Sequence, residues 1–122
     1  MRAHHFPRLG LFFALLTVLP PDIFGQGSGK WLARASMPSS RTEVAAVEFG
    51  GKIYVMGGFG QGGELVEEYE PANDRWRRRA PLPQPLHHVG AAAVAGKIYV
   101  IGGYVTARGS VNSVYEYDPS LN

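Results

Sequence analysis

The octet GKIYVMGG occupies residues 51–58, and it returns as GKIYVIGG at residues 96–103 with a single position changed. The two copies start 45 residues apart, and the similarity continues beyond them. Further along, Glu-Tyr-Glu-Pro at 68–71 matches Glu-Tyr-Asp-Pro at 116–119, an offset of 48 residues. A period of this length, in a glycine-rich sequence of short apolar runs, is typical of β-propellers and β-solenoids.

Each repeat divides into four short segments that we expect to be strands, named a to d in chain order. Strand a is expected at 44–49 and 89–94, strand b at 53–56 and 98–101, and strand c at 66–69 and 114–117. A proline after strand c ends the ladder, and the PANDR turn leads to a strand d that contains Trp76. Strand b is apolar on both faces, so we expect it to pack between neighbouring blades.

Three recurring features mark the repeat: the glycine pairs after strand b, the tyrosines beside acidic residues and proline, and the tryptophan of strand d. They comprise Gly57, Gly58, Tyr69, Trp76, Gly102, Gly103 and Tyr117. This pattern resembles the kelch repeat over about 31–122. The resemblance implies an all-β fold of four-stranded antiparallel β-propeller blades, here forming an incomplete ring.

The glycine pairs have a geometric interpretation. They end strand b where φ turns positive or where backbones approach too closely for a side chain. The alternative is a phosphate-binding loop, but neither GGFGQGG (57–63) nor GGYVTARG (102–109) is followed by a helical pattern with Lys-Ser/Thr. A nucleotide site is therefore not expected.

Residues 1–25 are predicted to form a signal peptide. Arg2 and Arg8 give a positively charged start, 9–19 is an apolar run, and a proline pair follows. A helix of that length rises about 16 Å against roughly 30 Å of hydrocarbon, so it is too short to span a membrane. We expect a secreted or periplasmic protein with no membrane association after cleavage. The alternative is a buried helix of a cytosolic domain.

The repeat pattern divides the rest of the chain into an N-terminal strand d at 26–40, kelch repeat 1 at 41–85, and kelch repeat 2 at 86–122, which lacks its strand d. An N-terminal strand d is typical of ring closure, because it completes the last blade. Two blades cannot close a ring, so we expect the N-terminal part of a propeller of about six or seven blades. The alternative is that several copies complete a ring, and oligomers are expected only in that case.

The composition limits the classes of partner. The chain has a formal net charge of +2 and no cysteine. The basic cluster RWRRR at 75–79 is interrupted by Trp76 and has acidic neighbours, so we interpret it as the solvated side of an exposed strand. No nucleic-acid partner is expected. The absence of cysteine excludes disulfides and thiolate chemistry.

Binding residues are expected on the loops between strands b and c and on the links from strand d to the next strand a. These segments are long and irregular, and they lie at 37–43, 59–65, 82–88 and 104–113. The candidate binding residues are Arg41, Glu43, Glu64, His87, His88 and Arg108. The Arg41 guanidinium could hold a ligand carboxylate, or it could hydrogen-bond loop carbonyls, which is the favoured interpretation.

Two groups contain residue types that occur in metal or acid–base sites, but their spacing along the chain is not expected to bring the side chains together. His87 and His88 are adjacent, and adjacent side chains on a strand point to opposite sides, so no metal ion is expected. Glu67, Glu68 and Glu70 are subject to the same alternation and are expected to be solvated at the blade edge. No catalytic residue and no cofactor are assigned.

Two functions remain open, and the first is favoured. It is an exported scaffold that binds a protein or a carbohydrate through its variable loops. The second is a carbohydrate-active enzyme, active as a full ring, because the resemblance extends to sialic-acid epimerases and galactose oxidases. The galactose-oxidase cofactor needs a cysteine cross-linked to a tyrosine beside copper. This chain has no cysteine, although the further blades expected for a full ring could supply one.

Overall fold

The computed structural model describes residues 29–121 of the chain. All the strands given below lie within the compact unit that spans Leu32–Asn122. The predicted signal peptide at 1–25 lies outside the described residues. Within the part that is described, no helix is long or apolar enough to cross a membrane.

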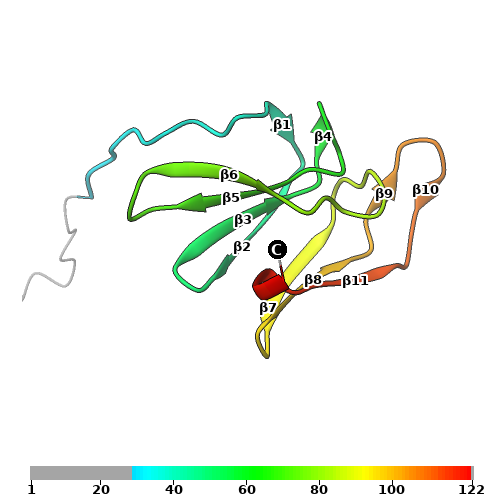
Figure 1. Ribbon diagram of the computed structural model, residues 1–122. Helices are drawn as coiled ribbons and strands as arrows, with labels where there is room; N and C mark the ends of the chain where they lie inside the picture. Colours follow the sequence, from blue (N-terminus) through cyan, green and yellow to red (C-terminus); the bar gives the residue numbers. More distant parts are fainter. Residues whose placement is uncertain (1–28, 122) are drawn as a thin grey trace, which may run out of the picture. The chain divides into compact units, whose positions relative to one another are not determined.

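The first blade is a four-stranded antiparallel sheet in the order β2-β3-β5-β6 (Figure 1). Its strands are β2 (Ala45–Phe49), β3 (Lys52–Met56), β5 (Val66–Glu70) and β6 (Arg75–Arg79). They are strands a to d of repeat 1, and the first three start and end within one residue of the predicted bounds. The prediction of an antiparallel blade is confirmed.

The second blade has three strands in the order β11-β8-β7. They are β7 (Gly90–Val94), β8 (Lys97–Ile101) and β11 (Val114–Tyr117), followed by the 3₁₀ turn η1 (Pro119–Leu121). In both blades, strands a and b are joined by a two-residue turn whose residues have positive φ, as a type I′ hairpin requires. The described residues thus form two blades and no closed ring.

Short strand pairs extend the end of the blades that carries the long loops, and these were not predicted. In blade 1, β1 (Arg41–Thr42) pairs with β4 (Phe59–Gly60). In blade 2, β9 (Tyr104–Val105) pairs with β10 (Gly109–Ser110), and His87 forms an isolated bridge with Tyr104. Thr42 faces Phe59 in blade 1 as His87 faces Tyr104 in blade 2, so the repeat governs the loop end as well.

One hydrophobic core joins the two blades. It contains Tyr54 and Met56 from β3, Ile98 and Val100 from β8, and also Val66, Leu82 and Leu86. The two a strands, β2 and β7, lie next to each other. Strand b is apolar because the neighbouring blade supplies part of the surface against which it packs, as predicted.

The glycine pairs have the geometric role predicted for them. A Cβ added to Gly58, at φ 115°, would lie 2.6 Å from the Val44 side chain and 2.7 Å from the Thr42 carbonyl oxygen. At the equivalent Gly103, at φ 97°, it would lie 2.5 Å from the Val89 side chain and 2.7 Å from the His87 carbonyl oxygen. Backbone approach of this kind leaves no room for a side chain.

The segment predicted as an N-terminal strand d contains no strand over residues 29–40. A strand d needs a strand c beside it. Among the described residues, β11 of blade 2 is a strand c without a strand d, and residues 29–40 do not pair with it. Ala35 instead binds blade 1: its amide donates to Asp74 Oδ1 at 2.8 Å, and its carbonyl accepts from Trp76 Nε1 at 2.8 Å. Tyr69 packs on Trp76 with ring centroids 5.0 Å apart. Ring closure by 26–40 therefore stays a prediction.

The expectation that Glu67 and Glu68 are solvated is wrong, because both are 0% exposed. Alternation along β5 does separate them, as predicted. Glu67 Oε2 accepts hydrogen bonds from Arg41 at 2.8 Å and from Ser39 at 2.6 Å. Arg41 also donates to the carbonyls of Gly57 and Leu65, so the interpretation that it binds loop carbonyls is confirmed.

Replacing Glu67 with Gln should lower the free energy of unfolding by about 3–5 kcal/mol, because Arg41 becomes a buried charge without a counter-ion. The R41M variant should cost at least as much. In the double variant, the loss of free energy of unfolding should be clearly smaller than the sum of the losses in the two single variants, since both charges are removed together. Urea unfolding followed by circular dichroism measures these free energies.

The matched control is E70Q, on the same strand but partly exposed, which should cost less than about 1 kcal/mol. Additive losses in the double variant would contradict a buried ion pair between Arg41 and Glu67.

Candidate functional site

The link that precedes strand a of blade 2 docks against the loop end of blade 1. Leu86 accepts a hydrogen bond from the Gly58 amide at 2.8 Å and donates one to the Gly63 carbonyl at 3.0 Å. Two residues further on, the His88 amide donates to the Glu43 carbonyl at 3.1 Å. The corners that start strand a in the two blades are therefore held side by side.

Three of the six candidate binding residues meet at this point. Nδ1 of His87 lies 3.2 Å from Glu43 Oε2, and Nδ1 of His88 lies 3.3 Å from the same oxygen. The two Nδ1 atoms are 2.8 Å apart. The expectation that adjacent histidines point to opposite sides is wrong here, because His88 has φ 54° and precedes β7 rather than lying in an extended strand.

Aromatic rings surround His87 on this surface. The His87 ring stacks on Tyr104 with centroids 5.8 Å apart, and it meets the edge of Phe59 at 5.5 Å. Phe59 and Tyr104 are 51% and 47% exposed. Beside them is a cavity of about 240 Å³, lined by Gly58, Phe59, Gly60, Gly63, Pro85, Leu86, His87 and Thr106. We call the three rings and this cavity the aromatic cleft.

Phe59 and Tyr104 were not among the candidate residues, although the sequence held a signal for them. Each directly follows the glycine pair of its repeat, so an aromatic residue recurs at the first position of the variable loop. An aromatic residue that recurs at equivalent positions of a repeat is usually interpreted as a core packing residue. The structure instead leaves both rings about half exposed.

The other three candidates lie elsewhere. The Arg41 side chain is 0% exposed and bound to Glu67, so it has a structural role. Glu64 is half-buried in the loop before β5, and its carbonyl accepts a hydrogen bond from the Leu82 amide. Arg108 is exposed in the turn between β9 and β10.

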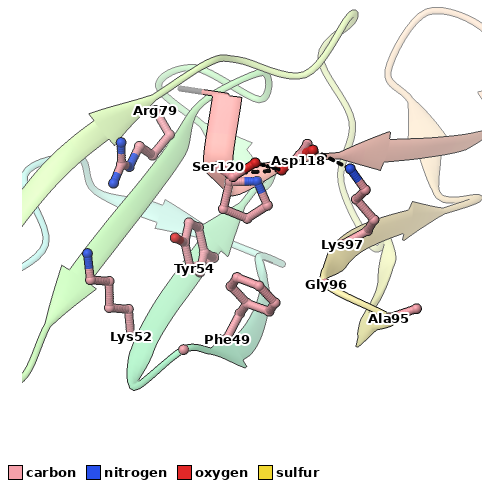
Figure 2. Close-up of a pocket in the computed structure, with 11 residues that line it drawn as sticks. Phe49, Lys52, Tyr54, Arg79, Ala95, Gly96, Lys97, Asp118 and Ser120 are labelled. Carbon is pink, nitrogen blue, oxygen red and sulfur yellow. Dashed lines mark hydrogen bonds and ion pairs between the residues drawn. The ribbon is translucent and has the colours of Figure 1, made fainter.

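A second, larger cavity of about 450 Å³ lies between the turns at the opposite end of the blades (Figure 2). Its lining contains three cations, Lys52, Arg79 and Lys97, which would suit an anion. Each already has an anionic partner: Lys52 and Arg79 bind Glu68, and Lys97 binds Asp118. Hydrogen bonds from Lys97 and Ser120 lower the pKa of Asp118 to about 2. Each cation that lines this cavity is therefore already paired within the chain.

Glu68 is ionised despite its burial. Burial acts to raise its pKa, but hydrogen bonds from Tyr54, Arg79 and Lys52 outweigh that effect and lower the pKa to about 2. Burial and the hydrogen bond to Glu68 raise the pKa of Tyr54 to about 12. Arg77 of the basic cluster also pairs with Glu68, at 2.8 Å. The basic cluster thus helps to neutralise the buried carboxylate of Glu68 on β5.

The antiparallel four-stranded blade, with its core shared with a second blade, defines a β-propeller type of architecture. The family of the Kelch motif matches residues 40–83 and 85–122, more than half of the chain, and the chain belongs to this family. Kelch repeats build β-propeller scaffolds that generally mediate protein interactions. A comparison with curated proteins found no match.

The ionisation of Glu68 predicts how stability depends on pH. Its pKa is about 2 in the folded chain, against an ordinary value of 4.5. The depressed pKa stabilises the fold fully above about pH 5, and this contribution is lost as the pH falls towards 2. The E68Q variant should therefore show a weaker fall in the free energy of unfolding over this range, measured by urea unfolding at a series of pH values.

The control for this experiment is E48Q, since Glu48 is exposed on β2. It should keep the wild-type dependence on pH. An unchanged pH dependence in E68Q would contradict the assignment of the acid-sensitive contribution to Glu68.

Proposed function

We propose that the chain is part of an exported scaffold that binds a protein ligand through the loops between strands b and c and the links between strands d and a. The aromatic cleft is its contact surface. The observation that carries this proposal is the pair of half-exposed rings, Phe59 and Tyr104, at equivalent positions of adjacent blades. Exposed aromatic rings contribute strongly to affinity when a partner covers them.

The size of the cleft favours a protein ligand. Its cavity of about 240 Å³ is smaller than the roughly 300–1,000 Å³ of most small-molecule pockets. It has room for one large side chain, anchored against Leu86 and between flanking rings. A loop or peptide that inserts such an anchor would cover Phe59 and Tyr104 at the same time.

A carbohydrate is the second ligand class, because a sugar ring can also stack on Tyr104 or Phe59. Titration of the chain with galactose and with sialic acid, followed by NMR, distinguishes the two classes. Upfield ring-current shifts of the sugar protons, absent with the Y104A and F59A variants, would indicate sugar stacked on these rings. Anomer exchange faster than in buffer would indicate an epimerase-like enzyme rather than a scaffold.

For a protein ligand, peptides selected from a random display library on the full chain provide the probe. The Y104A and F59A variants should bind these peptides about tenfold more weakly or worse, because each removes a ring at the centre of the contact. Fluorescence anisotropy with a labelled peptide measures the affinity.

The matched control is V94A, which removes an exposed apolar side chain of β7 beside the turn at the other end of the blade. It should leave the affinity unchanged. Peptides that bind Y104A and F59A as tightly as the wild type would contradict the proposed surface.

We also propose that residues 1–25 direct export. The support is the order of charged start, apolar run and proline pair. In a bacterial host expressing the full chain, the mature protein should be recovered outside the cytoplasm with an N-terminus near residue 26. Edman sequencing or mass spectrometry measures it, and an intact N-terminus on cytoplasmic protein would contradict export. Replacing 12–16 of the apolar run with polar residues should abolish cleavage.

A further inference from the structure

We propose that Glu43, His87 and His88 bind a divalent transition-metal ion, zinc above all, at the boundary between the two blades. Each residue offers one ligand atom, and these atoms lie within 4.8 Å of one another. Two imidazoles and a carboxylate are ligand types that zinc prefers. This inference goes beyond the scaffold function and does not depend on it.

The spacing of the three atoms fits an ion. They form a triangle with sides of 2.8, 3.2 and 3.3 Å. An ion about 2.0–2.1 Å from all three, as zinc requires, would sit about 1 Å out of their plane. This is close to the position of a tetrahedral ion above three of its ligands, so small side-chain adjustments suffice.

Hydrogen bonding alone leaves the cluster incompletely satisfied. An ionised carboxylate oxygen only accepts, and a neutral imidazole carries one proton on one of its two nitrogens. One proton between the two Nδ1 atoms forms a hydrogen bond between the two histidines, but the same proton cannot also form a good hydrogen bond to Glu43 Oε2. A cation at the centre accepts electron pairs from all three atoms at once.

The backbone positions the three ligands. The His88 amide binds the Glu43 carbonyl, and His87 exchanges two backbone hydrogen bonds with Tyr104, at 3.1 and 2.9 Å. Glu43 and His88 have φ of 57° and 54°, a left-handed conformation that costs about 1 kcal/mol or more for residues with a side chain. Backbone strain of this kind is concentrated at functional sites.

The site is open on one side. The side chains of His87, Glu43 and His88 are 16%, 36% and 52% exposed. Structural zinc sites use four protein ligands, whereas sites with three protein ligands leave a position for water or for a bound group. The fourth position here would face solvent next to the aromatic cleft, where an incoming ligand could reach it.

Titration of the full chain with zinc chloride should show one tight site per chain by isothermal calorimetry. Cobalt chloride should give the visible absorption bands of a tetrahedral ion with nitrogen and oxygen ligands. The H87F and E43Q variants should each weaken binding about tenfold or more, since each removes one ligand. H87F keeps a ring stacked on Tyr104, and E43Q keeps the shape of the side chain, so both should retain the far-UV circular dichroism of the wild type.

The other two histidines of the chain, His4 and His5, provide the matched control. The H4N/H5N variant should bind zinc as tightly as the wild type. Zinc should also raise the melting temperature of this variant but not that of H87F, because only an ion bound to the folded state stabilises it. No binding at micromolar zinc, or binding that H4N/H5N loses and H87F keeps, would overturn the proposal.

Discussion

The two hydrogen bonds that Leu86 makes with Gly58 and Gly63 are the constraint on which the loop end of the structure depends. They require the backbone of one blade to touch the backbone of the next. A Cβ on Gly57 would lie 2.6 Å from the Leu86 carbonyl oxygen, so the glycine pair keeps this contact open. Leu86 is then 1% exposed in the shared core, and the residues after it are carried to the corner of the preceding blade.

Buried charge is the second condition of the fold. Glu67 and Glu68 point to opposite faces of β5, and each has its own set of cations. Glu67 binds Arg41, which precedes strand a, whereas Glu68 binds Lys52 on β3 and arginines of β6. Removing either partner of such an ion pair leaves a buried charge without a counter-ion. The free-energy cost of that buried charge exceeds what the intact ion pair contributes to stability. The charged residues therefore specify which strands lie together.

The strands could be predicted because their signals are local: β-rich runs, type I′ turns and prolines lie within a few residues of one another. The burial of Glu67 and Glu68 could not, since it depends on Arg41 and on β6, which come from other parts of the chain. His87 and His88 were placed correctly on a variable link, but their convergence on Glu43 was missed. It results from the left-handed backbone at His88, whose amide is bound by the other blade. Alternation rules apply to extended strands and do not hold at such a corner.

Glu43 and His88 occupy equivalent positions, 45 residues apart, and share the same left-handed φ. The repeat therefore dictates the backbone at this corner but leaves the side chain free to differ. Because the corners of adjacent blades lie side by side, one blade supplies a carboxylate and the next supplies imidazoles to the same point. A single blade cannot form this cluster. Its chemistry is a property of the blade boundary, so the identity of two corner residues can change what the surface binds without altering the sheets.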